Sequence, residues 1–377
     1  MRSPLAALPV LLAVLGPVGA QAVTESKVLL LRHCPRAPYP TDRYPPLSPY
    51  NNYTQQDNFS ARAFPSFAQW GAKAGMCTPN GLKLARQIGA ALPAILGSEH
   101  AAVAADAAPR CKDSAAALGV NSSDVQVDQA LFDPLNANLP KCSQPDWHGT
   151  LAAEVQKARE KLQGARKLLP KLQTILGRGR APPLDEIPDV VHGGHYVGGL
   201  RVASESIVET FELERTSSIP TAWGELSDAE LRELLQLRST YFAVTYGGRD
   251  ITQRYASGVF AKLLEKSLPP ATVLIGHDLN LQAVRSLLGI EWQCGMWAAN
   301  ALTPLSGIMF TLSESSVRIQ YVCPTLTDSE PLVLGEASFA GGEREMPISQ
   351  FSSLLRSAIE WDCVKSSRAE SENVVFA

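Results

Sequence analysis

The chain has 377 residues, of which 45% are apolar and 19% are charged. This composition suits one large domain, or two smaller ones, with a real hydrophobic core. The 34 basic and 37 acidic residues leave a net charge of −3, so nothing in the overall charge favours nucleic acid or an anionic membrane as a partner.

The first 20 residues are typical of a secretory signal peptide. Arg2 supplies the positive charge, residues 5–14 form the apolar core, and residues 18–20 form a small-residue cleavage site. The apolar run is too short for a comfortable membrane span, and no later stretch qualifies as one. We therefore expect an exported protein, periplasmic or extracellular, that starts near Gln21.

Seven cysteines in an exported chain indicate disulfides with one cysteine left over. The sequence alone does not fix their pairing. Three glycosylation sequons occur, at Asn52, Asn58 and Asn121, and they matter only if the source is a eukaryote.

A basic motif occupies residues 32–38, directly after a predicted strand at 27–31. In it, Arg32 and Arg36 flank His33. The planar fork of an arginine donates to two phosphate oxygens at once, and a neutral histidine can attack phosphorus. The sequence therefore favours a phosphate monoester as ligand, and the alternative is a solvated strand end with chance basic residues.

The next part of the chain again places an arginine shortly after a predicted strand. Residues 39–66 predict a long loop, and residues 78–81 open a helix. A small apolar strand at 101–105 then ends at Asp106, and a helix is expected at 113–118. Arg110 lies between them as a candidate phosphate ligand, or else as a surface arginine at a helix start.

The middle of the chain, from 147 to 264, is predicted to be mostly helical. A helix at 151–169 should end or kink at Pro170. Residues 157–180 hold eight basic residues and one acid, which favours a solvated helix face over a docking surface for an anion. Residues 181–191 predict a linker. His192 and His195 lack cysteine or carboxylate neighbours, so we expect a turn there and no metal.

Three further helices complete this region. Glu209 lies beside the inward face of a helix at 197–213. Residues 227–230 form a capping box with a hydrophobic staple, and the helix that follows carries Arg238 among its apolar positions. The third helix is expected at 251–264.

A sheet pattern resumes after residue 267. A strand at 272–275 ends at Gly276-His277-Asp278, and a helix follows at 280–288. A hairpin is expected from 307–312 and 317–322, and a final helix at 348–360. Three sets of phosphate-suited residues, at 32–33, 110 and 277–278, thus follow the carboxyl ends of short apolar runs. In an open α/β sheet, ligands bind at that edge.

The chain resembles the histidine acid phosphatase family, branch 2 of the histidine phosphatase superfamily. Its motif RHGxRxP is matched by Arg32, His33, Arg36 and Pro38, while Cys34 replaces the glycine. The family motif HD is matched by His277-Asp278. The resemblance is closest to the bacterial phytase and glucose-1-phosphatase type, and it includes residues 133–135, 222–224 and 276–281. Cys77 stands where relatives carry a leucine before T-P-x-G.

This resemblance implies a phosphoglycerate-mutase-like α/β fold, in which a three-layer α/β/α catalytic domain comprises residues 21–130 and 267–377. A mostly helical domain, residues 131–266, is inserted into it. The alternation of strands and helices at both ends of the chain agrees with this division.

The resemblance also implies an acid phosphatase that needs neither a cofactor nor a metal. Arg32, Arg36, Arg110 and His277 would bind the phosphoryl group. His33 would form a phosphohistidine, and Asp278 would protonate the leaving oxygen and later deprotonate water. Relatives place a glutamate like Glu209 beside the cleft. The partner would be a small phosphorylated substrate, such as an inositol phosphate, a sugar phosphate or another monoester, and the oligomeric state is left open.

We make three predictions for the cysteines: two disulfide pairs and the state of Cys34. Relatives have a long-range bridge between positions similar to Cys142 and Cys363, and we also expect a pair between Cys294 and Cys323. Beside arginines the thiolate of Cys34 would be favoured and reactive. The alternatives for Cys34 are an inert buried thiol or a bridge, perhaps to Cys111.

Two functions other than that of an acid phosphatase are also considered. A degenerate motif with Cys34-Pro35 would misplace His33 and leave a non-catalytic phosphate-binding relative. An isomerising mutase on the same superfamily fold is the third reading, and the secretion signal and the HD pair argue against it.

Overall fold

The computed structural model describes the chain at residues 25–39, 60–120, 122–177, 189–191, 195–197 and 199–365. The expected signal peptide, the three sequons, His192 and most of the 39–66 and 181–191 segments lie outside the described residues. Residues 60–66, the described end of the predicted loop, form neither helix nor strand. No helix within the described ranges is long and apolar enough to cross a membrane.

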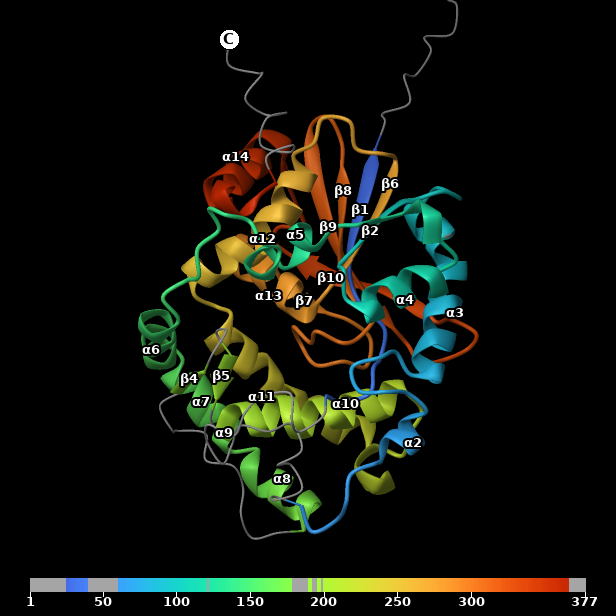
Figure 1. Ribbon diagram of the computed structural model, residues 1–377, viewed down its shortest axis with the longest axis vertical. Helices are drawn as coiled ribbons and strands as arrows, with labels where there is room; N and C mark the ends of the chain where they lie inside the picture. The colour runs from blue at the N-terminus through green and yellow to red at the C-terminus, as the bar shows by residue number, and fades with distance from the viewer. Residues whose placement is uncertain are drawn as a thin grey trace, which may run out of the picture.

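A mixed sheet is the centre of the fold, with the strand order β3-β2-β6-β1-β8-β9-β10-β7 (Figure 1). Strand β1 (Ser26–Arg32) pairs in parallel with β6 (Ala271–Gly276) and antiparallel with β8 (Gly307–Leu312). The other strands are β2 (Ala102–Ala105), β3 (Val125–Val127), β7 (Glu291–Gln293), β9 (Ser316–Pro324), β10 (Leu332–Ser338) and β11 (Glu345–Pro347), which pairs with β9.

Helices cover both faces of this sheet. Successive side chains of β1 point to opposite faces, and those of residues 28–31 are apolar and buried, so each face packs against helices. Leu29 and Leu31 join a core with α3 (Pro79–Leu96) and α4 (Pro109–Ala117). Val28 and Leu30 join the other core, to which α12 (Arg249–Leu263), α13 (Asp278–Leu288) and α14 (Ile348–Ala358) contribute. The predicted three-layer α/β/α arrangement is confirmed.

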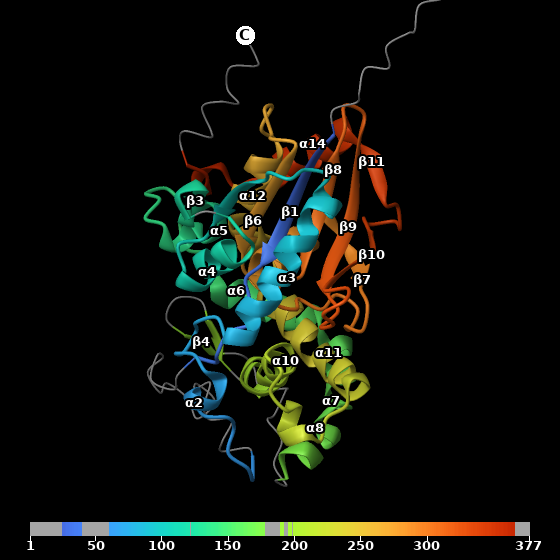
Figure 2. The same ribbon diagram turned by 90° about the vertical axis from the view of Figure 1, so that its right-hand side faces the viewer.

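The chain between β3 and β6 is mostly helical and lies largely beyond one end of the sheet. In both views the carboxyl end of β1 points toward α10 (Figure 1, Figure 2). The elements of this part, with the short helix α2 that precedes α3, are α2 (Phe67–Trp70), α5 (Gln129–Phe132), α6 (Trp147–Lys157), α7 (Arg159–Arg166), α8 (Leu169–Leu176), β4 (Asp189–Val191), β5 (His195–Val197), α9 (Gly199–Arg201), a π-helical segment (Val202–Val208), α10 (Glu209–Thr216) and α11 (Asp228–Thr245). The limits 131–266 for an inserted domain stay a prediction.

Several helix boundaries differ from the sequence prediction. The helix expected at 151–169 is divided into α6, α7 and the start of α8. Pro170 does not end a helix, because it lies in the first turn of α8, where its missing N–H has no partner to lose. The helix expected at 113–118 begins four residues earlier, at Pro109, because proline is also tolerated in the first turn of this helix. Strands β3, β4, β5, β7, β10 and β11 were not predicted.

Local capping signals agree with the structure. The hydroxyl of Thr78 accepts a hydrogen bond from the Gly81 N–H at 3.0 Å, which caps α3. Ser227 and Glu230 form the predicted capping box of α11. The hairpin of β8 and β9 is also present. These features depend on residues close in sequence, which is why spacing alone predicted them.

Disulfides Cys142–Cys363 and Cys294–Cys323 are present, as predicted. The first joins the segment before α6 to the end of the described chain and spans 221 residues. The second spans only 29 residues. Because a cross-link restricts the unfolded chain more when it closes a longer loop, the first bridge should stabilise the fold more.

We expect the double variant Cys142→Ala/Cys363→Ala to lose about 4–5 kcal/mol of unfolding free energy, and Cys294→Ala/Cys323→Ala to lose about 3–4 kcal/mol. Denaturant titration of both variants and the wild type would measure this. A larger loss for the shorter loop would contradict the loop-length argument.

Candidate active site

The predicted site residues converge at one edge of the sheet. Strands β2, β6 and β1 are parallel neighbours, and Arg32 is in register with Gly276. Parallel strands end at the same edge, so the residues after each strand become neighbours. The rings of His33 and His277 lie 5.5 Å apart between centroids. Arg32 Nη2 lies 3.0 Å from Asp278 Oδ2.

His33 is held as a neutral imidazole. Its Nδ1 lies 2.8 Å from the carbonyl oxygen of Cys34. A carbonyl only accepts, so Nδ1 carries the proton and Nε2 keeps its lone pair. Burial, together with Arg110, His277 and the other nearby arginines, lowers the pKa of His33 well below 6.5. The side chain thus has the charge state that a nucleophile needs.

Cys34 is not a reactive thiol, so that expectation was wrong; the alternative of a bridge is confirmed, but its partner is not Cys111. Cys34 forms a disulfide with Cys77, next to the Thr78 cap of α3. The backbone supports the bridge, since Arg36 and Cys77 pair as an isolated β-bridge and the Thr78 N–H donates to the Pro35 carbonyl at 3.0 Å. A cross-link therefore holds the loop in which relatives carry glycine.

Arg110 and His277 face each other. Arg110 Nη2 lies 3.2 Å from His277 Nδ1, and Asp106 Oδ1 lies 3.1 Å from His277 Nε2. Burial opposes a charge on His277, but Cys111 and Asp106 outweigh burial and Arg110 and raise its pKa to about 10. A guanidinium and a protonated imidazole are both donors, so an anion between them would satisfy both.

Glu209 connects the arginines. Its carboxylate accepts from Arg32 at 2.7 Å, from Arg36 at 3.0 Å and from Arg238 at 2.7 Å. Burial raises its pKa, but Arg238, Arg36 and Arg32 together lower it below the usual value, so the carboxylate is ionised. Glu209 was expected beside the cleft, and it lies within the arginine cluster itself.

Sequence reasoning missed the role of Arg238 on α11. Its side chain is 4% exposed, and its Nη2 lies 2.7 Å from both Glu209 Oε1 and Asp278 Oδ2. Glu212 lies 3.5 Å from both Arg238 and Arg32. A signal was present, because Arg238 falls on the apolar face of its predicted helix, where an unpaired charge is costly.

Tyr39 was also missed. Its ring lies 4.3 Å from the guanidinium carbon of Arg36 and 5.7 Å from that of Arg110. An aromatic face attracts cations at such distances. Nothing in the proline- and tyrosine-rich sequence distinguished this tyrosine from its neighbours.

Asp278 is ionised in the ligand-free protein. Burial raises its pKa, but Arg32 and Arg238, with help from His277 and Arg36, hold it well below the usual range. Its Oδ1 also accepts from the Leu279 N–H at 2.9 Å. For this carboxylate to act as a proton donor, an anion must first engage the arginines.

We expect Arg238→Met to lose about 3–5 kcal/mol of unfolding free energy, because it removes one of the cations that neutralise the buried carboxylates Glu209, Glu212 and Asp278. Arg232→Met, on the exposed side of the same helix, is the control and should change stability by about 0.5 kcal/mol or less. Denaturant titrations at two pH values would test the cause: the penalty should shrink at acid pH, where the carboxylates become protonated. Equal losses for the two variants would contradict it.

No protein-family profile matches the chain, and no curated protein matches its sequence. Solved structures do match. The phytase from Citrobacter braakii has a TM-score of 0.73 and 19% identity, covering 91% of this chain and 100% of its own. The phytase of Klebsiella sp. ASR1 has a TM-score of 0.71 and 19% identity, covering 91% and 96%. The Hafnia alvei phytase in complex with myo-inositol hexakis sulphate has a TM-score of 0.70 and 20% identity, covering 90% and 98%. The chain therefore has the fold of the bacterial phytases, as the resemblance implied.

Proposed function

We propose that this protein is an acid phosphatase that hydrolyses phosphate monoesters through a phosphohistidine intermediate. The observation that carries the proposal is the neutral His33, whose Nδ1–H is held by the Cys34 carbonyl among Arg32, Arg36 and Arg110. This arrangement combines a nucleophile with cations that bind a phosphate dianion.

The charge balance supports an anionic substrate. Glu209 binds three arginines but carries a single negative charge. Asp278 offsets part of the remainder through Arg32 and Arg238. Arg110 lies beside His277, whose ring is 5.5 Å from that of His33. A phosphate dianion placed among these groups would neutralise the excess positive charge. It would also accept hydrogen bonds from both Arg110 and His277, two donors that otherwise face each other.

The proposed reaction has two steps. In the first, the lone pair on His33 Nε2 attacks phosphorus while the bond to the leaving oxygen breaks, and Asp278 gives that oxygen a proton. In the second, Asp278 takes a proton from water, whose oxygen attacks the phosphohistidine. Phosphate leaves and His33 returns to its neutral state. Arg32, Arg36, Arg110 and His277 would hold the phosphoryl oxygens throughout.

We propose an inositol phosphate, a sugar phosphate or another small monoester as the substrate. The matching Hafnia alvei structure holds myo-inositol hexakis sulphate, an analogue of an inositol phosphate. The Cys34–Cys77 bridge supports catalysis over a degenerate binding protein, because it fixes the loop that positions His33. We also propose export, which the signal-like N-terminus and the three disulfides support.

We expect His33→Ala to lower turnover of an aryl phosphate at least about a thousandfold, because it removes the nucleophile. Rapid quenching of the wild type during turnover should trap acid-labile phosphate on the protein, and the variant should trap none. His100→Ala, which changes an exposed histidine, is the control and should behave as the wild type. Unchanged turnover in His33→Ala would refute the proposal.

Asp278→Asn should lower the rate most for poor leaving groups, such as sugar or inositol alkoxides. An activated aryl phosphate needs less protonation, so its rate should fall less. Steady-state kinetics on both substrate types would measure the difference. Equal losses on the two types would exclude Asp278 as the proton donor.

The pH profile of the wild type follows from the same two groups. Rising pH removes the proton that Asp278 gains when the dianion binds, so activity should fall toward neutral pH. Falling pH protonates His33, whose lowered pKa should place this limb well below pH 6.5. Asp278→Asn should remove the fall toward neutral pH and leave the acid limb.

A further inference from the structure

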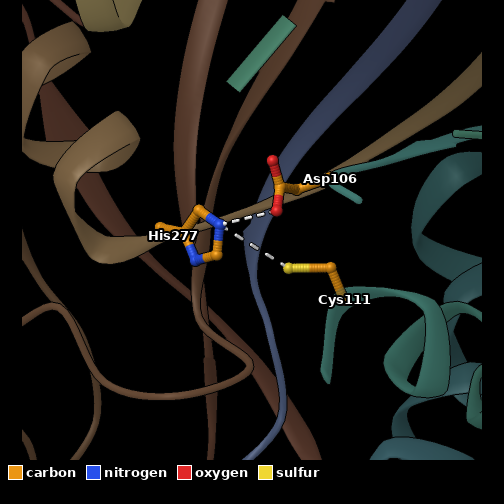
Figure 3. A group of neighbouring side chains, drawn as sticks. All are labelled: Asp106, Cys111 and His277. Carbon is orange, nitrogen blue, oxygen red and sulfur yellow. Dashed lines mark hydrogen bonds and ion pairs between the residues drawn. The ribbon is translucent and has the colours of Figure 1, made fainter. Parts of the chain in front are cut away.

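Three side chains gather behind the phosphate-facing side of His277. Asp106 follows β2, Cys111 lies on α4, and His277 follows β6 (Figure 3). His277 presents Nδ1 to Arg110 and Nε2 to this cluster. Its Nε2 lies 3.1 Å from Asp106 Oδ1 and 3.9 Å from Cys111 Sγ. The proposed phosphoryl transfer uses Nδ1 of His277, and Cys111 takes part in it only through its effect on the pKa of His277.

The donor atoms have the spacing of a metal site. One atom from each residue, the thiol sulfur, the imidazole nitrogen and a carboxylate oxygen, lies within 4.8 Å of the other two. Around a tetrahedral zinc ion with bonds of about 2.0–2.3 Å, neighbouring donors lie about 3.3–3.8 Å apart. The distances of 3.1 and 3.9 Å fall on either side of this range, so small side-chain movements suffice.

A second observation points to a missing ligand. Asp106 is 4% exposed, and its Oδ2 has no hydrogen-bond partner among the described residues. The oxygen that faces His277 is Oδ1, which also accepts from the Ala108 N–H at 2.8 Å. A buried carboxylate with one oxygen unpartnered is costly, and a cation held by the carboxylate would offset part of that cost. Cys111 is fully buried, and it is the one cysteine of seven outside the three disulfides.

We propose that Asp106, Cys111 and His277 bind a zinc ion. A thiolate, an imidazole and a carboxylate are the ligand types that zinc takes, and three protein ligands leave the fourth position to water. Binding displaces the proton on His277 Nε2 and the proton of the Cys111 thiol. The two negative ligands balance the charge of the ion, so the site stays neutral.

Zinc at this position would slow the proposed phosphatase. The ion must draw the imidazole toward Cys111, away from the space that Nδ1 shares with Arg110. A small displacement of a substrate-positioning group is enough to lower a rate. This consequence rests on the proposed function, whereas the binding site itself does not.

Cobalt(II) provides a test that does not depend on activity. A thiolate bound to cobalt gives a near-ultraviolet charge-transfer band, and with six cysteines in disulfides Cys111 is the only free thiol that can produce it. We expect the oxidised wild-type protein to show this band at one cobalt per chain and to lose it when zinc is added. Absence of the band would overturn the site.

Matched variants complete the test. Cys111→Ser keeps the size of the side chain and should lose the band and bind zinc at least tenfold more weakly, with its zinc-free turnover measured as its own reference. Asp106→Asn should weaken zinc binding while the band persists at higher cobalt. Zinc should inhibit the wild type, reversibly with a chelator, and inhibit Cys111→Ser at least tenfold less. Equal zinc binding by the wild type and Cys111→Ser would refute the site, and zinc binding without inhibition would refute the effect on activity.

Discussion

The ion pair between Arg32 and Glu209 joins the end of the central strand to α10. Arg32 ends the central strand and is fully buried, while Glu209 begins α10 and is 2% exposed. Removing either partner would unbalance a group of buried charges, which costs more than the pair itself contributes. The same guanidinium is a predicted phosphate ligand. The requirement to neutralise Arg32 therefore also fixes where the helical segment lies against the sheet.

The rest of the cluster follows from this requirement. The single negative charge of Glu209 cannot balance three arginines. Asp278 balances part of the remaining positive charge, and Arg32 and Arg238 lower its pKa well below the usual range. Glu205, one turn before Glu209, shows the opposite effect: burial, with Glu209 close by, raises its pKa to about 7. Carboxyl groups on one helix thus differ in charge because they differ in their distance from the guanidinium groups.

The sequence predicted the parts of the site that depend on strand ends. Arg32-His33 and His277-Asp278 each follow an apolar run, and the parallel pairing of β1 and β6 brings them together. Arg238 and Glu212 could not be assigned in this way. Their burial is acceptable only because partners distant in sequence neutralise them: Arg32 neutralises Glu212, and Glu209 neutralises Arg238. Pro170 was misread because proline both ends helices and begins them, and only the flanking backbone decides which.

Cys34 and Cys77 are the two places near His33 where the chain departs from the histidine acid phosphatase motifs that it resembles, and they are the two ends of one bridge. The departures are therefore one change rather than two defects. Restoring glycine at position 34 alone would strand a thiol at Cys77, and restoring leucine at position 77 alone would strand one beside His33. The loop that carries His33 is therefore cross-linked only where both cysteines are present and the surroundings are oxidising.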